Sequence, residues 1–117
     1  MAAPGTLSTV RRVLSLRRRA LRMLQAELGR SARSLADLDR QRERLAGVRA
    51  TLFAGAGRAF ALDALCLADV EREWLSWLGH RRDAEREHER LEGALARMRA
   101  EIRALEVYAN RLAVVSR

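Results

Sequence analysis

The sequence predicts an all-α fold, an antiparallel two-helix coiled-coil hairpin that spans residues 1–117 as a single unit. The 117 residues are 49% hydrophobic and 32% charged but only 4% aromatic, a composition typical of coiled coils. No proline follows Pro4, so nothing in the chain forces a long helix to stop. Apolar residues recur at heptad spacing in two stretches, and a glycine-containing segment separates them.

The first helical arm is expected over about residues 6–52, after a short irregular start at Pro4 and Gly5. Thr6 or Ser8 can serve as its N-cap. Ten of 14 expected seam positions are apolar, which indicates sustained coiled-coil patterning. These positions are Leu7, Val10, Leu14, Arg17, Leu21, Leu24, Leu28, Ser31, Leu35, Leu38, Arg42, Leu45, Arg49 and Leu52.

The bend is expected within about residues 53–63, because Gly55 and Gly57 form the strongest turn signal in the chain. The second arm then covers about residues 64–116, with a local bend expected at Gly79. Twelve of its 14 seam positions are apolar. These positions are Leu67, Val70, Trp74, Trp77, Arg81, Ala84, His88, Leu91, Leu95, Met98, Ile102, Leu105, Ala109 and Leu112.

The charge is unevenly distributed along the sequence. All 23 basic residues are Arg, and the formal net charge is +8. Residues 1–58 hold 13 Arg against 4 acidic residues, a net of +9, whereas residues 59–117 hold 10 Arg against 11, a net of −1. A basic half of this kind is attracted to acidic surfaces, whether nucleic acid, anionic lipid or an acidic protein.

No catalytic or metal-binding constellation emerges from the sequence, so we expect a protein that is not an enzyme and has no cofactor. His80 and His88 are eight residues apart, which is not the spacing of a helical zinc site. We expect His88 to fill a polar layer of the seam and His80 to be solvated. Cys66 has no nucleophile context and is expected to be half-buried. No apolar run reaches bilayer length and no secretory signal opens the chain, so we expect a cytoplasmic protein without membrane insertion.

Two clusters leave alternatives open. The basic cluster, Arg11, Arg12, Arg17, Arg18, Arg19 and Arg22, is either an anion-facing patch or an ordinary solvated helix face. Trp74 and Trp77 occupy successive seam positions, so they form either a bulky core layer or, with Phe53 and Phe60, an exposed aromatic patch for a protein partner.

The segment from Leu7 to Arg18 has the form L-x-x-[IV]-[RK]-x-[VL]-L followed by further basic residues. It resembles the start of the injectisome stalk proteins of the YscO and InvI kind. The layout of two long helices, a bend and Trp residues soon after it also resembles flagellar FliJ. The resemblance covers most of the chain as architecture but about twelve residues as sequence.

The resemblance implies a stalk that couples a hexameric export ATPase to the export gate of a type III secretion system. Its ATPase-binding end would comprise Leu7, Val10, Arg11, Arg12, Leu14, Arg17 and Arg18, which the adjoining Arg19 and Arg22 extend. Its gate-facing bend would carry Phe53, Phe60, Trp74 and Trp77. The composition leaves two alternatives, a basic helical nucleic-acid-binding protein and a generic coiled-coil adaptor or chaperone.

Overall fold

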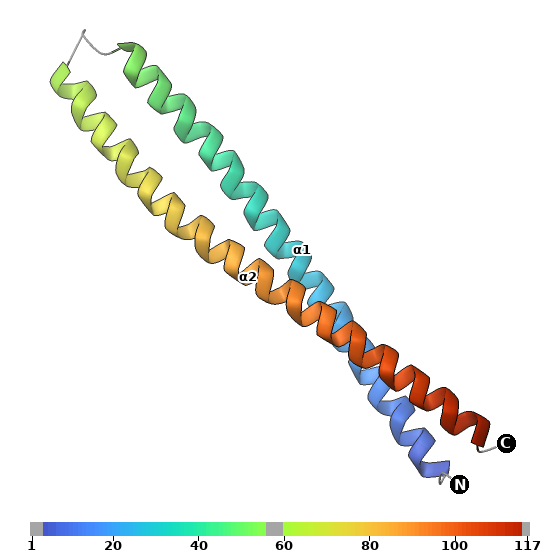
Figure 1. The fold of residues 1–117 in the computed structure, drawn as a ribbon. Coiled ribbons are helices and arrows are strands. Elements are labelled where there is room, and N and C mark those ends of the chain that lie inside the picture. Colours follow the sequence, from blue (N-terminus) through green and yellow to red (C-terminus); the bar gives the residue numbers. More distant parts are fainter. Residues whose placement is uncertain (1–3, 56–59, 116–117) are drawn as a thin grey trace. The chain divides into compact units, whose positions relative to one another are not determined.

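The protein is all-α, as the sequence predicts. The computed structural model describes residues 4–55 and 60–115, and it describes side chains for residues 6–54 and 66–115. All described residues lie in two helices, α1 (Pro4–Gly55) and α2 (Phe60–Val115) (Figure 1). None of the described helical segments is both long and apolar enough to cross a membrane.

The helix ends differ from the predicted ones. α1 already begins at Pro4, so Thr6 and Ser8 lie inside the helix and are not its N-cap. Proline suits the first turn, where its missing N–H leaves no hydrogen bond unmade. Residues 53–55 and 60–63 of the predicted bend are helical, and Gly57 lies outside the described residues. α2 is helical through Gly79, and the local bend predicted at this residue stays a prediction.

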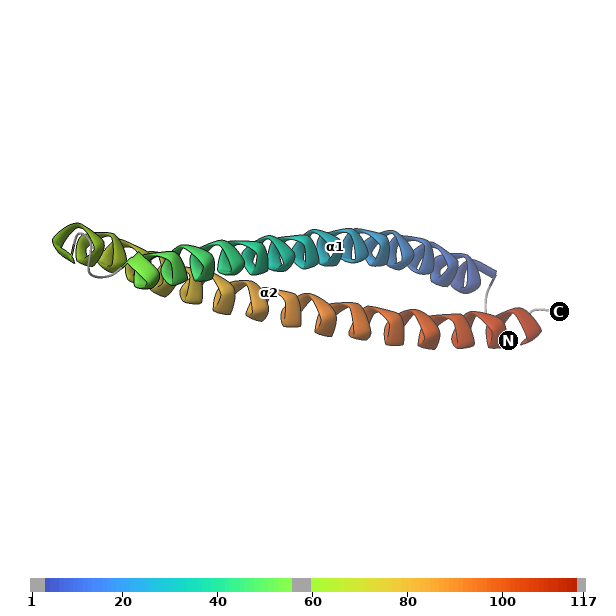
Figure 2. The ribbon, with the colours of Figure 1, turned by 90° about the horizontal axis from the view of Figure 1, so that it is seen from above.

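Packing divides the chain into two compact units, each of which contains a segment of both helices. Unit 1 comprises Met1–Gly29 and Glu89–Arg117, and unit 2 comprises Arg30–His88. Within each unit α1 and α2 lie side by side (Figure 2). The helices are antiparallel, because residues later in α1 contact residues earlier in α2. In unit 2, Ser31 contacts His88 and Arg49 contacts Glu71.

Burial confirms the predicted seam. All 14 seam positions of α2 and all ten apolar seam positions of α1 are buried or half-buried. Three of the four polar seam residues of α1, Arg17, Arg42 and Arg49, are exposed, since a guanidinium loses hydration if it is buried without a full set of partners. The heptad spacing therefore identifies the contact face of both helices.

The apolar core is concentrated in unit 1. Val10 and Leu14 of α1 form a buried cluster with Ile102, Ala109 and Leu112 of α2. Leu7, Leu21, Met98 and Leu105 pack against this cluster from its edges. Burying a Val, Leu or Ile side chain stabilises a fold by about 1.5–3 kcal/mol, so this cluster is the main apolar contribution to unit 1.

Unit 2 has a more polar seam. Only Val70 and Trp77 are buried among its described side chains. Arg81 lies at a seam position with 27% of its side chain exposed, and its Nη1 donates to the carbonyl oxygen of Leu35 at 3.4 Å. The Arg81 guanidinium also lies 3.6 Å from Asp39 and 3.0 Å from Glu85. Unit 2 thus relies on hydrogen bonds and ion pairs where unit 1 relies on apolar packing.

Candidate interaction surfaces

The basic cluster lies in unit 1, on the segment of α1 that packs over the apolar core. All six of its Arg residues are exposed. Arg17 and Arg18 form ion pairs across the helices, with Nη1 of Arg17 3.5 Å from Glu101 and Nη2 of Arg18 3.8 Å from Glu106. Among the described residues the other four form no ion pair: Arg11, Arg12, Arg19 and Arg22. Their charge is therefore available to a partner.

The predicted ATPase-binding residues fall into two groups. Val10 and Leu14 are buried and Leu7 packs against their cluster, so these three stabilise the helix pair and offer little surface to another protein. The Arg residues of the basic cluster offer the exposed surface instead. The apolar half of the opening motif is thus structural, and the basic half is the candidate binding surface.

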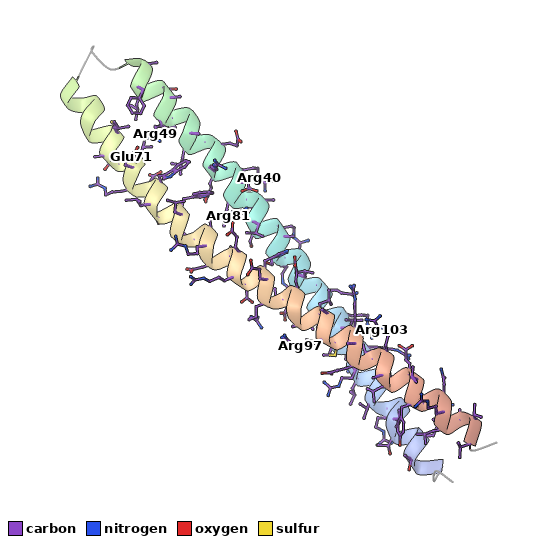
Figure 3. All side chains as sticks on the ribbon, viewed as in Figure 1. Arg40, Arg49, Glu71, Arg81, Arg97 and Arg103 are labelled. Carbon is purple, nitrogen blue, oxygen red and sulfur yellow. The ribbon has the colours of Figure 1, made fainter. Side chains whose placement is uncertain are left out.

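Folding changes the distribution of charge. Unit 1 holds 12 Arg against 5 acidic residues, a net of +7, because α2 adds Arg90, Arg97, Arg99, Arg103 and Arg111, with Arg117 at the end of the chain. Figure 3 shows the side chains along both helices, with Arg97 and Arg103 labelled. Unit 2 holds 11 Arg against 10 acidic residues, a net of +1. The positive charge of the protein therefore belongs to unit 1, and both helices contribute to it.

The two tryptophans have different environments, although their ring centroids are only 5.4 Å apart at 37°. Trp77 is 7% exposed, and its Nε1 donates a 2.7 Å hydrogen bond to the carbonyl oxygen of Leu38 on α1. It is a core residue of unit 2, the first of the two alternatives for the Trp pair, and its gate-facing role stays a prediction. Trp74 is half-buried and lines a hollow of about 270 Å³ with Phe53.

Among the described side chains of unit 2, Phe53 and Trp74 are the accessible aromatic residues. The Phe53 side chain is 55% exposed, and the guanidinium of Arg49 lies over its ring, 5.6 Å from the centroid. Nε of Arg49 lies 2.9 Å from Glu71, which holds that guanidinium in place. The side chain of Phe60, the remaining residue of the predicted patch, lies outside the described side chains.

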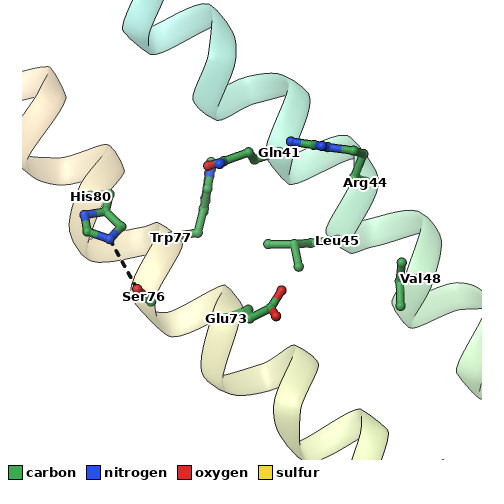
Figure 4. Close-up of a pocket in the computed structure, with 8 residues that line it drawn as sticks. All are labelled: Gln41, Arg44, Leu45, Val48, Glu73, Ser76, Trp77 and His80. Atoms are coloured by element: carbon green, nitrogen blue, oxygen red, sulfur yellow. Dashed lines mark hydrogen bonds between the residues drawn. The ribbon is translucent and has the colours of Figure 1, made fainter.

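A second hollow of unit 2 lies beside Trp77 and has a volume of about 450 Å³ (Figure 4). α1 contributes Gln41, Arg44, Leu45 and Val48 to its walls, and α2 contributes Glu73, Ser76, Trp77 and His80. Oγ of Ser76 and Nε2 of His80 are hydrogen-bonded at 3.3 Å along one wall. The combination of an apolar floor with a rim of both charge signs suits a side chain of a partner protein better than a small charged metabolite.

The histidines and the cysteine behave as predicted. Nδ1 of His88 is hydrogen-bonded to Oγ of Ser31 at 3.0 Å, so two polar seam residues form one layer. His80 is exposed and Cys66 is half-buried. Within residues 6–54 and 66–115 no group of three His, Cys, Asp or Glu side chains could hold a metal ion.

Comparisons of this chain with protein-family models, with curated proteins and with solved structures find no match.

Proposed function

We propose that the protein is a non-enzymatic cytoplasmic stalk that couples a hexameric export ATPase to the export gate of a type III secretion system. One observation supports this proposal above the others: unit 1 presents four exposed Arg residues, without ion-pair partners among the described residues, on an apolar core. A stalk needs a stable end that keeps its shape inside a ring, together with charge that attracts an acidic rim.

Unit 2 supplies the second requirement of an adaptor, a separate surface of different chemistry. Phe53 and Trp74 are accessible beside a hollow, and aromatic side chains of this kind are enriched at the energetically dominant positions of protein interfaces. The seam of this unit is polar, so it can adjust its packing at a smaller cost than the apolar core of unit 1. We assign the gate-facing role to Phe53 and Trp74.

The test of the proposal replaces Arg11, Arg12, Arg19 and Arg22 by Gln. This variant should bind a hexameric export ATPase at least tenfold more weakly than wild type does, and the residual affinity should depend less on salt, since charged contacts steer association. Its melting temperature should stay close to wild type, because exposed charges contribute about 0–1 kcal/mol each.

The matched control removes the same charge from unit 2. Arg30, Arg33, Arg42 and Arg44 are also exposed and form no ion pair among the described residues. Replacing these four by Gln should leave ATPase binding within about twofold of wild type, since none of them belongs to the basic cluster. Equal losses in the two quadruple variants would show that only net charge matters and would refute a specific ATPase-binding end.

Nucleic-acid binding is the second candidate, and the net charge of +7 on unit 1 favours it. The basic cluster contains no Asn to read adenine edges, so such binding would use phosphate contacts without sequence preference. Duplex DNA titrated at increasing salt separates the candidates. If wild-type protein binds duplex DNA at physiological ionic strength and does not bind the ATPase, the nucleic-acid function is favoured over the stalk function.

A further inference from the structure

We propose that unit 1 carries a second binding surface, an apolar flank edged by arginines that binds the surface of an anionic lipid bilayer. This inference goes beyond the stalk function, and the flank adjoins the basic cluster, with which it shares Arg12 and Arg19. The apolar flank consists of Val13, Leu16, Ala20 and Met23 on α1 and of Ala104, Tyr108 and Val115 on α2. Every one of these residues lies outside the predicted seam.

Helix geometry places these residues on one side of the helix pair. On α1 they follow one another at intervals of three, four and three residues, so they form a single stripe. Val13 lies four residues before Arg17, and Ala20 lies three residues after it, so both share a face with Arg17. Arg17 in turn contacts Glu101 of α2. Ala104 and Tyr108 continue from Glu101 at intervals of three and four residues. The Arg17–Glu101 pair therefore joins the two stripes along one flank.

The apolar side chains of this flank stand out from the helices. Leu16 is 59% exposed and Met23 is 62% exposed, and on α2 Tyr108 and Val115 are 48% and 51% exposed. Val13 and Ala20 are half-buried beneath them. The half-buried Glu27, one turn after Met23, ends the stripe. Large apolar side chains that remain this exposed over several helical turns mark an interaction surface.

Arginines border the flank on α1 and lie within its row on α2. Arg12 lies four residues before Leu16, and Arg19 lies four residues before Met23. Both arginines therefore adjoin the apolar stripe of α1. On α2, Arg97 and Arg111 lie seven residues before and after Ala104, so they share its row at either end. Among the described residues none of these four arginines forms an ion pair. Within the described part of this flank the one acidic residue is Glu101, which forms an ion pair with Arg17.

This arrangement matches a bilayer surface better than a protein helix. A partner helix needs a groove to receive its side chains, whereas this flank is a row of protruding residues. A hollow that could receive a partner's side chain, the one in Figure 4, lies in unit 2 and not on this flank. A row of Leu and Met between arginines inserts shallowly among acyl chains while the guanidinium groups reach anionic headgroups. Tyr108, with an apolar ring and a polar hydroxyl, is suited to the same depth.

The experiment is flotation of the full chain with vesicles of phosphatidylcholine mixed with phosphatidylglycerol, and with vesicles of phosphatidylcholine alone. Wild type should float with the anionic vesicles only. The Leu16→Ser/Met23→Ser variant should lose at least tenfold in affinity even at low salt. The Arg12→Gln/Arg19→Gln variant should lose about fivefold for each arginine, as expected for basic residues near an anionic surface.

Matched controls come from unit 2, where Val48 and Leu75 are similarly exposed and Arg42 and Arg44 form no ion pair among the described residues. The Val48→Ser/Leu75→Ser and Arg42→Gln/Arg44→Gln variants should bind anionic vesicles as wild type does. Circular dichroism verifies that every variant remains helical.

Three outcomes would overturn the inference. If wild type does not float with anionic vesicles, the flank is not a lipid-binding surface. A Leu16→Ser/Met23→Ser variant that floats like wild type would show that the attraction is purely electrostatic. A loss of ATPase binding, with vesicle binding retained, in the same variant would assign the flank to a protein partner.

Discussion

Trp77 and Trp74 are three residues apart, yet their truncation should affect stability very differently. Removing a buried Trp side chain from a core costs about 3–5 kcal/mol. Trp77 also donates a hydrogen bond to Leu38, worth about 1 kcal/mol. One side of Trp77 lines the hollow beside Leu45, so water can fill part of the space left behind, and we expect the lower limit of about 3 kcal/mol for Trp77→Ala. Trp74 is half-buried, and Trp74→Ala should cost about 1 kcal/mol.

Chemical denaturation followed by circular dichroism measures both losses. A single domain has a total stability of about 5–15 kcal/mol, so Trp77→Ala should remove a large part of it and lower the melting temperature by about 10 °C or more. The chain contains two Trp residues, so each variant also leaves one fluorophore. Trp77 alone should emit further to the blue than Trp74 alone. Equal losses for the two variants, or a loss below about 1 kcal/mol for Trp77→Ala, would refute the assignment of Trp77 to the core.

Other substitutions test the seam and the helices. Met98→Asp should unfold the protein because it places a charge beside the apolar cluster of unit 1, whereas Glu89→Gln on the surface should change the melting temperature little. Gly79→Ala should stabilise by about 1 kcal/mol, since an added Cβ meets no atom within 4 Å; a lower melting temperature would mean that α2 is not helical there. Replacing Ser31 and His88 together by Leu should raise the denaturation midpoint, because an apolar layer replaces a polar one; a lower midpoint would show that their hydrogen bond contributes more than apolar packing can.

The contact face of each helix could be predicted from the sequence because an α-helix converts spacing directly into direction. Residues three and four apart share a face, so an apolar heptad pattern identifies the side that must be covered. Ser31 and His88 are informative here. Both break the apolar pattern, yet the register keeps them on the seam, and the structure pairs them with each other. At Ser31 and His88, a polar residue at a seam position therefore indicates a polar layer between the helices and not a wrongly assigned heptad register.

Features that depend on the opposite helix could not be predicted in the same way. Arg17 and Arg18 look equivalent to Arg19 in the sequence, but only the first two reach glutamates of α2. Trp74 and Trp77 both occupy seam positions, and which of them is buried depends on the α1 residues that face each one. The helix ends also differed, because a proline at the first turn and a glycine at the last turn are compatible with continuing the helix.

The charge of the chain shows how folding turns a property of the sequence into a property of a surface. In unit 2 the basic α1 segment, residues 30–55 with a net of +3, lies against the acidic α2 segment, residues 60–88 with a net of −3. Ion pairs such as Arg49–Glu71 join these segments, so most of their charge is balanced inside the unit. In unit 1 the segments 1–29 and 89–117 carry +5 and +2, and no acidic helix faces the basic one. Like charges on both helices oppose their association, so the apolar cluster around Leu14 and Ile102 must offset this repulsion. The fold therefore places its main apolar core beneath its largest unbalanced charge and leaves that charge on the surface of unit 1.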